Sequence, residues 1–143
     1  EYTPVAGGVA IATKDVSGEP VIYSPEWSYN LAANYRRPVG NKLNALARLD
    51  YRFVDEQQGL SSQNPYTILD SYGITNLRLG LETVDGKYSI TGWVNNVFDE
   101  TYGVYISGYN FSAQQNPMNG NTITNVIPKG ADRFYGVTLR ANF

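Results

Sequence analysis

Apolar and polar residues alternate along much of the chain. Between 27 and 35 the odd positions are Trp27, Tyr29, Leu31, Ala33 and Tyr35. The even positions between them are polar except for Ala32. An alternation with a period of two places the two sets on opposite faces of a β-strand. Residues 27–37 are therefore predicted to form a strand with one apolar face and one polar face.

The same alternation recurs further along the chain. It predicts strands at 43–56, 72–82, 88–107 and 134–143. In the last of these, the apolar set is Tyr135, Val137, Leu139, Ala141 and Phe143. A helix is disfavoured, because apolar residues do not recur at intervals of three and four. Residues 1–26 are predicted to be mostly loop, since glycine and proline interrupt any pattern there.

The connections between these strands alternate in length. Residues 38–41 and 84–87 are short turns, and Asp85-Gly86 is a strong hairpin signal because both central positions of that turn need positive φ. The connections at about 57–71 and 109–133 are long and polar. Outer-membrane β-barrels alternate short periplasmic turns with long external loops in this way.

The pattern alone does not say what covers the apolar face. A soluble β-barrel or sandwich that binds a small apolar ligand produces the same alternation, and this alternative remains open here. Lipid is favoured by strand length, because the segments reach the roughly 9–11 residues that cross a bilayer. It is also favoured by arginines confined to the polar face, because a cation at the lipid midplane costs roughly 2–4 kcal/mol. These are Arg36, Arg48, Arg52, Arg78 and Arg140.

Aromatic residues lie towards both ends of the predicted strands, with Leu and Ala between them. Two aromatic girdles of this kind mark the membrane interfaces of a barrel. A spanning sheet must also close on itself, and closure needs at least about 8 strands. The five predicted strands, or six if one more is counted, are too few, so we expect an incomplete barrel whose other strands precede Glu1.

Several motifs resemble the end of TonB-dependent outer-membrane receptors. The segment 93–102, Trp-Val-Asn-Asn-Val-Phe-Asp-Glu-Thr-Tyr, resembles the family signature aromatic-x-x-x-Asn-Leu-Phe-Asp-x-x-Tyr, with Val97 in place of the usual Leu. Residues 25–28 and 49–53 resemble the entry to an earlier strand and the strand after it. Residues 130–139 resemble the approach to the final strand. The likeness covers roughly residues 24–143.

The resemblance implies an all-β, antiparallel transmembrane β-barrel in the bacterial outer membrane. Residues 1–143 would be the C-terminal segment of a barrel of about 22 strands. The expected function is TonB-dependent uptake of a siderophore, haem, cobalamin or an oligosaccharide. The expected partners are outer-membrane lipid, the rest of the barrel, a plug domain, TonB through the missing N-terminal part, and the barrel-assembly machinery. The strand ending in Phe143 resembles the signal that this machinery reads.

The composition disfavours an enzyme. The chain has no Cys and no His, which removes thiolate metal sites and the commonest general base. Its net charge of −2, with dispersed cations, disfavours nucleic-acid binding. Neither Asp55-Glu56 nor Asp99-Glu100 has the spacing of a calcium loop. A secreted glycan-active enzyme domain is the third hypothesis, which the lack of His disfavours, and we expect no catalytic residue, cofactor or metal.

Ligand contacts are expected in the long loops, because outward loops on a rigid scaffold usually carry recognition. The candidates are Tyr66, Tyr105, Tyr109 and Phe111. These rings could stack on a sugar or an aromatic siderophore. The alternative, which we favour, is that they extend the aromatic girdle or pack the loops together.

Overall fold

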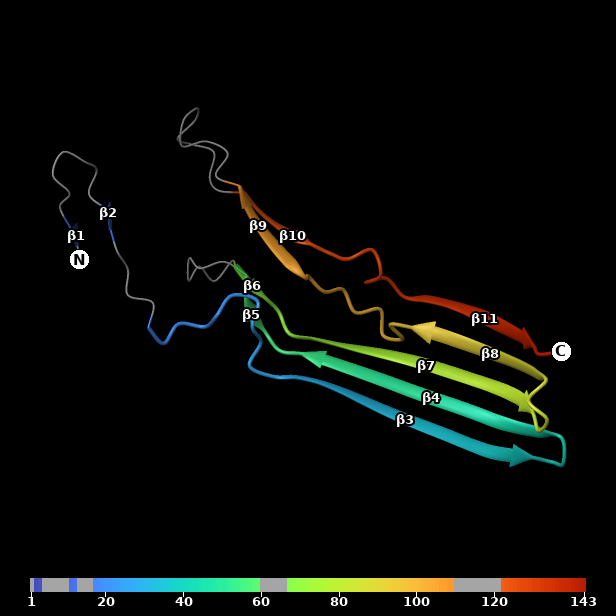
Figure 1. Cartoon of the computed structure of the whole chain (residues 1–143). Coiled ribbons are helices and arrows are strands. Elements are labelled where there is room, and N and C mark those ends of the chain that lie inside the picture. The colour runs from blue at the N-terminus through green and yellow to red at the C-terminus, as the bar shows by residue number, and fades with distance from the viewer. Residues whose placement is uncertain (1, 4–10, 13–16, 60–66, 110–121) are drawn as a thin grey trace.

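A five-stranded antiparallel sheet makes up most of the structure (Figure 1). The computed structural model describes residues 2–3, 11–12, 17–59, 67–109 and 122–143. The sheet has the order β11-β8-β7-β4-β3. Its strands are β3 (Ser28–Val39), β4 (Leu43–Val54), β7 (Tyr72–Thr83), β8 (Tyr88–Asn95) and β11 (Phe134–Ala141). Strands that follow each other in the described chain thus mostly lie side by side.

Two short turns join strands of the sheet at one end. Gly40, between β3 and β4, has φ 63°, and Gly86, between β7 and β8, has φ 69°. Only glycine adopts this left-handed region without a steric penalty, so both turns depend on it. The Val84 amide donates to the carbonyl of Lys42 at 2.9 Å, which holds the two turns next to each other.

Two-stranded hairpins lie beyond the other end of the sheet (Figure 1). One pairs β5 (Gln57–Gln58) with β6 (Ile68–Leu69), and the other pairs β9 (Tyr105–Tyr109) with β10 (Thr122–Val126). Near the start of the chain, β1 (Tyr2–Thr3) pairs with β2 (Ile11–Ala12). The expected long connection at 109–133 therefore contains a strand.

The prediction of one strand over 88–107 was wrong. β8 ends at Asn95, and β9 begins only at Tyr105. Asn96 has φ 50° and Asp99 has φ 58°, and left-handed residues cannot continue a strand. In the sequence, apolar residues continue on the same parity through this bend as far as Ile106, so periodicity alone did not reveal the break.

The sheet is open. β3 and β11 are its outer strands, and within the described residues neither pairs along its second edge. An open edge in hydrocarbon would leave backbone N–H and C=O groups without partners. Closure in a bilayer therefore requires further strands at both edges. No helix in the described part of the chain is long and apolar enough to cross a membrane.

Candidate functional site

One face of the five-stranded sheet is an outward apolar surface. The register places apolar residues of neighbouring strands opposite one another, as in the row Ala33, Leu49, Leu77, Val94 and Tyr135. The side chains of this face are not enclosed by the described chain. In the neighbouring row, for example, Leu79 is 55% exposed and Val137 is 67% exposed. A small soluble fold would bury such residues in its core. The geometry is that of a surface made to meet another apolar medium.

The opposite face carries charged side chains held in ion pairs. Arg48 on β4 makes a bidentate contact with Asp50 on the same strand, with Nε 2.8 Å from Oδ2 and NH2 2.6 Å from Oδ1. Arg36 on β3 reaches over β4 to Glu82 on β7, with 3.3 Å between NH2 and Oε2. Both acids that the five strands carry on this face are therefore engaged by arginine.

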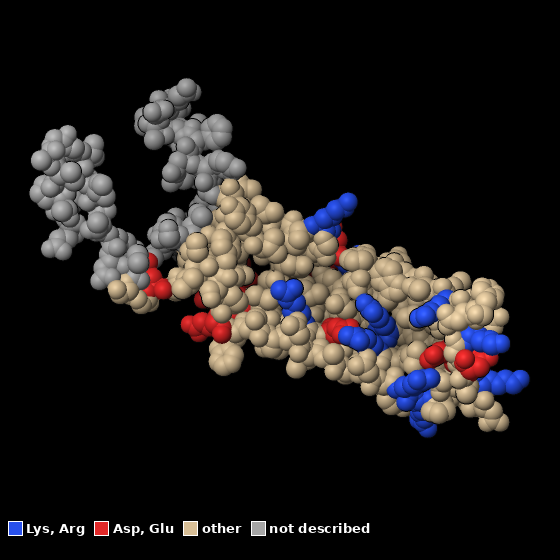
Figure 2. Space-filling model, viewed as in Figure 1, with Lys and Arg blue, Asp and Glu red and all other residues tan. Residues whose placement is uncertain are grey.

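The charged face has a surplus of arginine. Besides the two paired arginines it carries Arg52, Arg78 and Arg140, so in the described sheet five cations share two carboxylates. Figure 2 shows Lys and Arg along the length of the sheet, with acidic side chains among them. Like charges on one wall raise the local positive potential and attract anionic groups.

Trp93 also belongs to the charged face. Its Nε1 donates to Oγ1 of Thr138 at 3.2 Å, and its ring meets Phe134 edge-on, with centroids 5.7 Å apart. Gly136 makes room for it, because a Cβ there would lie 2.5 Å from the indole. The ring thus contacts three residues of β11 and joins this strand to β8.

A small core lies where the sheet ends and the hairpins begin. Leu69 and Ile106 are almost completely buried there. The hydroxyl of Tyr23 donates to the carbonyl of Ile106 at 3.2 Å and accepts from its amide at 3.3 Å. Gly59 is required beside them, because a Cβ would lie 2.9 Å from the Ile106 side chain. The hairpins are thus packed on one another and on the segment before β3.

The family-like segment 93–102 forms a polar junction at this end. Asn96 is 2% exposed, and its Nδ2 donates to the carbonyls of Glu100 and Ala131 while its Oδ1 accepts from the Glu100 amide at 2.9 Å. Asp99 accepts from the amide of Arg133 at 2.8 Å. The segment thereby ties the end of β8 to the start of β11, a role that the sequence motif alone did not reveal.

The candidate ligand contacts are only partly within the described residues. Tyr105 is half exposed, and its ring stacks on Tyr23 with centroids 5.7 Å apart. Tyr109 ends β9, and nothing is described of its side chain. Tyr66 and Phe111 lie outside the described residues. The contact of Tyr105 with Tyr23 is a loop-packing contact that leaves part of the ring accessible.

The terminal strand presents its alternate residues to the outward face. Tyr135, Val137, Leu139 and Ala141 follow the apolar rows, and Phe143 lies fully exposed just beyond β11. Arg37 shares the outward parity of β3, so the expectation that arginines are confined to the polar face was wrong for this residue. It lies one residue before Pro38 and the turn, where a long side chain extends to the interface.

No group of three or more potential metal-ligating side chains occurs among the described residues.

The loop end, the charged face and the apolar face define a wall between lipid on one side and a polar interior on the other. Such a sheet is part of a transmembrane β-barrel of the bacterial outer membrane.

The particular family follows from comparison with known proteins. Residues 2–97, more than half of the chain, match the family model described as TonB dependent receptor-like, beta-barrel. The chain belongs to this family, as a portion of its barrel, and the proteins of the family are outer-membrane receptors. No solved structure matches the chain.

Proposed function

We propose that this chain forms part of the wall of a receptor for TonB-dependent uptake of a scarce nutrient. The nutrient classes are a siderophore, haem, cobalamin or an oligosaccharide. One observation carries the proposal: a single sheet has a predominantly apolar outward face and a charged opposite face held by the Arg36–Glu82 and Arg48–Asp50 ion pairs. A barrel built from such strands encloses a polar lumen large enough for a plug domain.

The experiment is uptake by cells that carry or lack the intact receptor. The gene is deleted and restored, and growth is measured with each of the four nutrient classes as the limiting source. We expect one class to support growth only when both the receptor and TonB are present. Growth that is independent of the receptor for all four classes would contradict the proposal.

The loop candidates belong to the same proposal. Tyr105 offers an accessible ring that already stacks on Tyr23. The other candidates belong to the two long connections of the sequence: Tyr66 to 57–71, and Tyr109 and Phe111 to 109–133. An aromatic ring pre-ordered by stacking loses little entropy when a planar ligand or sugar binds. Tyr105→Ala should weaken binding of the imported nutrient, whereas Tyr88→Ala, an aromatic at the turn end, should not.

The terminal strand supports a second part of the proposal, recognition by the barrel-assembly machinery. Its accessible outward residues, Tyr135, Val137, Leu139, Ala141 and Phe143, form an apolar row beside an edge without a partner in the described sheet. A machine that adds a strand at such an edge would read this row. Phe143→Ala should lower the amount of assembled receptor in the outer membrane, and Phe98→Ala, an exposed Phe in the loop-end bend, should not.

A further inference from the structure

A hollow of about 520 Å³ lies on the charged face of the sheet, over β7, β8 and β11. The volume falls within the range of about 300–1,000 Å³ that is usual for ligand sites. The described residues that line it share the parity of the charged face, and none of them is a carboxylate: Arg78, Ser89, Thr91, Trp93, Asn95, Thr138 and Arg140. The hollow therefore offers a small solute cations, hydroxyl groups and an indole ring.

Glycine at two positions keeps this hollow open. Gly80 lies opposite Thr91, and a Cβ there would come within 2.8 Å of the Thr91 hydroxyl oxygen. Gly136 lies opposite Trp93, and a Cβ there would lie 2.5 Å from the indole. A larger residue at either position would displace a side chain that lines the hollow. The space is thus a consequence of the residues chosen at these two positions.

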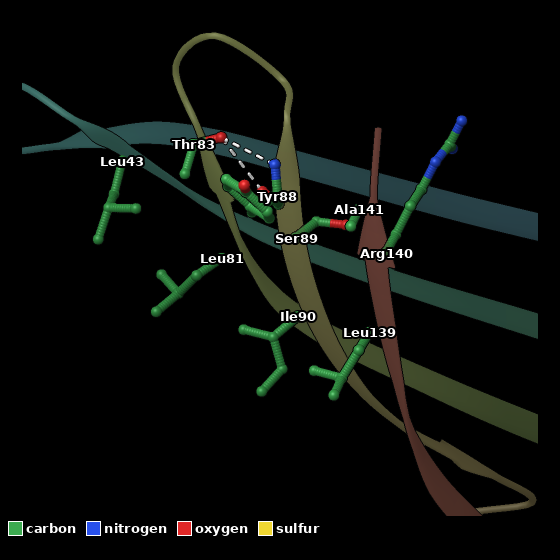
Figure 3. A pocket seen from close by; sticks show the side chains of 9 residues that line it. All are labelled: Leu43, Leu81, Thr83, Tyr88, Ser89, Ile90, Leu139, Arg140 and Ala141. Carbon is green, nitrogen blue, oxygen red and sulfur yellow. Dashed lines mark hydrogen bonds between the residues drawn. The ribbon is translucent and has the colours of Figure 1, made fainter. Parts of the chain in front are cut away.

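Two of the lining side chains are held so that hydrogen atoms remain to be donated. Trp93 Nε1 donates to Thr138 Oγ1 at 3.2 Å, so this hydroxyl is the acceptor there and its own hydrogen stays available. Arg140 Nε donates to Asn142 Oδ1 at 3.1 Å, which anchors the guanidinium and leaves its terminal nitrogens available. Figure 3 shows the Arg140 side chain pointing away from the apolar side chains of the opposite face. A ligand rich in hydrogen-bond acceptors fits this arrangement.

Arg78 has no carboxylate partner among the described residues. It lies directly opposite Arg48 in the register, and like charges directly opposite each other destabilise a sheet. Arg48 is neutralised by Asp50, and the other acid of this face, Glu82, is held by Arg36. The Arg78 side chain is exposed at the hollow. An anion bound there would supply the missing negative charge.

We propose that this hollow binds a small solute that carries at least two carboxylate or phosphate groups. Arg78 and Arg140 each hold one anionic group, because a guanidinium matches either kind with paired hydrogen bonds. The hydroxyls of Thr91 and Thr138 donate to the same solute. The inference rests on the proposed function in one respect, since it identifies this solute with the imported nutrient. It favours haem, through its propionates, or a siderophore with carboxylates over a neutral oligosaccharide.

The first test measures binding by the purified intact receptor and does not depend on uptake. Isothermal titration calorimetry records the affinity for citrate and for pyrophosphate, with erythritol as the neutral control. We expect at least one of the two anions to bind, which identifies the preferred group, and erythritol not to bind. Arg78→Gln or Arg140→Gln should weaken binding about tenfold, because each removes charge-assisted hydrogen bonds. Arg52→Gln, on the same face but outside the lining, should weaken it less than about twofold.

A further variant tests the hydroxyl groups without changing charge. Thr91→Val keeps the shape of the side chain and should weaken anion binding about threefold. Heat-modifiable mobility on gels checks that every variant is folded. Binding of neither anion overturns the proposal, because another part of the receptor would then cover the hollow. Equal weakening by Arg52→Gln and Arg78→Gln also overturns it, because the whole face would then attract anions without a defined site.

A growth assay distinguishes this inference from the proposed function. Cells whose receptor carries both Arg78→Gln and Arg140→Gln should need more of the limiting nutrient for half-maximal growth, whereas Arg52→Gln should behave as the wild type. Uptake of a neutral oligosaccharide would overturn the link between the anion site and the nutrient, while the uptake proposal would stand. Growth that is independent of the receptor would contradict uptake, and calorimetry would still decide whether the anion site exists.

Discussion

A single asparagine connects three segments at the loop end of the sheet. Asn96 is a polar residue, yet it is among the most buried residues of the described chain. Its side chain satisfies polar backbone groups of the 96–100 bend and of the approach to β11, and its own amide donates to Oδ1 of Asn76 at 3.0 Å. Asparagine tolerates the positive φ found here better than most residues. Asparagine therefore supplies the buried hydrogen bonds and also adopts the left-handed backbone conformation that this bend requires.

Replacing Asn96 with alanine should therefore weaken the barrel measurably. The side chain makes three hydrogen bonds, and each typically contributes about 0.5–1.5 kcal/mol. We expect the free energy of unfolding to fall by about 2–4 kcal/mol, measured by urea unfolding of the intact receptor with tryptophan fluorescence. Asn30→Ala, at an exposed position on β3, should change it by less than about 0.5 kcal/mol. Equal effects of the two variants would disprove the role of Asn96.

A second residue-level prediction concerns Asp85 in the β7–β8 turn. The Thr83 hydroxyl donates to its carboxylate and holds the pKa of Asp85 below its ordinary value, and the Lys87 amide acts in the same direction. Because the folded pKa is the lower one, the ionised carboxylate stabilises the turn at pH values above the unfolded pKa of about 3.9. This stability is lost as the pH falls through the folded value.

The measurement compares the wild type with Asp85→Asn in urea unfolding of the intact receptor at several pH values. The wild type should be the more stable near neutral pH, and the difference should shrink once the pH falls below about 4. Asp132→Asn, at the opposite end of the sheet, serves as the control. A difference between wild type and Asp85→Asn that is constant across this pH range would contradict the expectation.

At the scale of one strand, the two faces of β3 can be compared at nearly the same depth. Ala32 and Ala33 are adjacent, both exposed, and point to opposite faces, with Ala33 opposite Leu49 and Ala32 opposite Asp50. Ala33→Lys places a cation in lipid near the midplane and should cost roughly 2–4 kcal/mol. Ala32→Lys places the same cation near Asp50 in the lumen and should cost far less. Unfolding from lipid vesicles measures both, and equal costs would mean that the face assignment is wrong.

The elements that the sequence predicted well are those with uninterrupted alternation. In β4 and β7 the apolar parity, the glycine turns and the position of Arg48 with Asp50 on the polar face all follow from local pattern. The end of β8 did not follow, because Asn96 leaves the strand through a backbone conformation that parity does not record. The contact between Tyr23 and Ile106 joins residues 83 positions apart, and no local pattern signals it.

Arg37 shows a further limit of reasoning from parity. The alternation assigned arginine to the polar face, yet Arg37 lies on the outward face. Its place beside Pro38 at the strand end explains the exception, because a long side chain at the interface reaches water while its methylene groups stay in lipid. The rule that excludes cations from lipid therefore applies with depth, and not uniformly along a strand.

For the whole molecule, the five strands behave as one segment of a closed wall. The loop-end core packs the hairpins together, the turn end is fixed by Gly40 and Gly86, and the charged face is cross-linked from β3 to β7 by Arg36 and Glu82. These contacts make the sheet a preformed unit. Within the described residues, the two outer strands, β3 and β11, each lack a partner along one edge.

Hydrogen exchange of the intact receptor in lipid vesicles tests whether those edges are paired. β11 bonds to β8 along one edge only in the described sheet, so about half of its amides point away from β8. If a further strand pairs there, all amides of β11 should exchange slowly, like those of the central strand β7. Detergent-solubilised receptor should keep this protection, because closure is intramolecular. Fast exchange at every second residue of β11, with slow exchange throughout β7, would show an open edge and refute closure of the barrel at this strand.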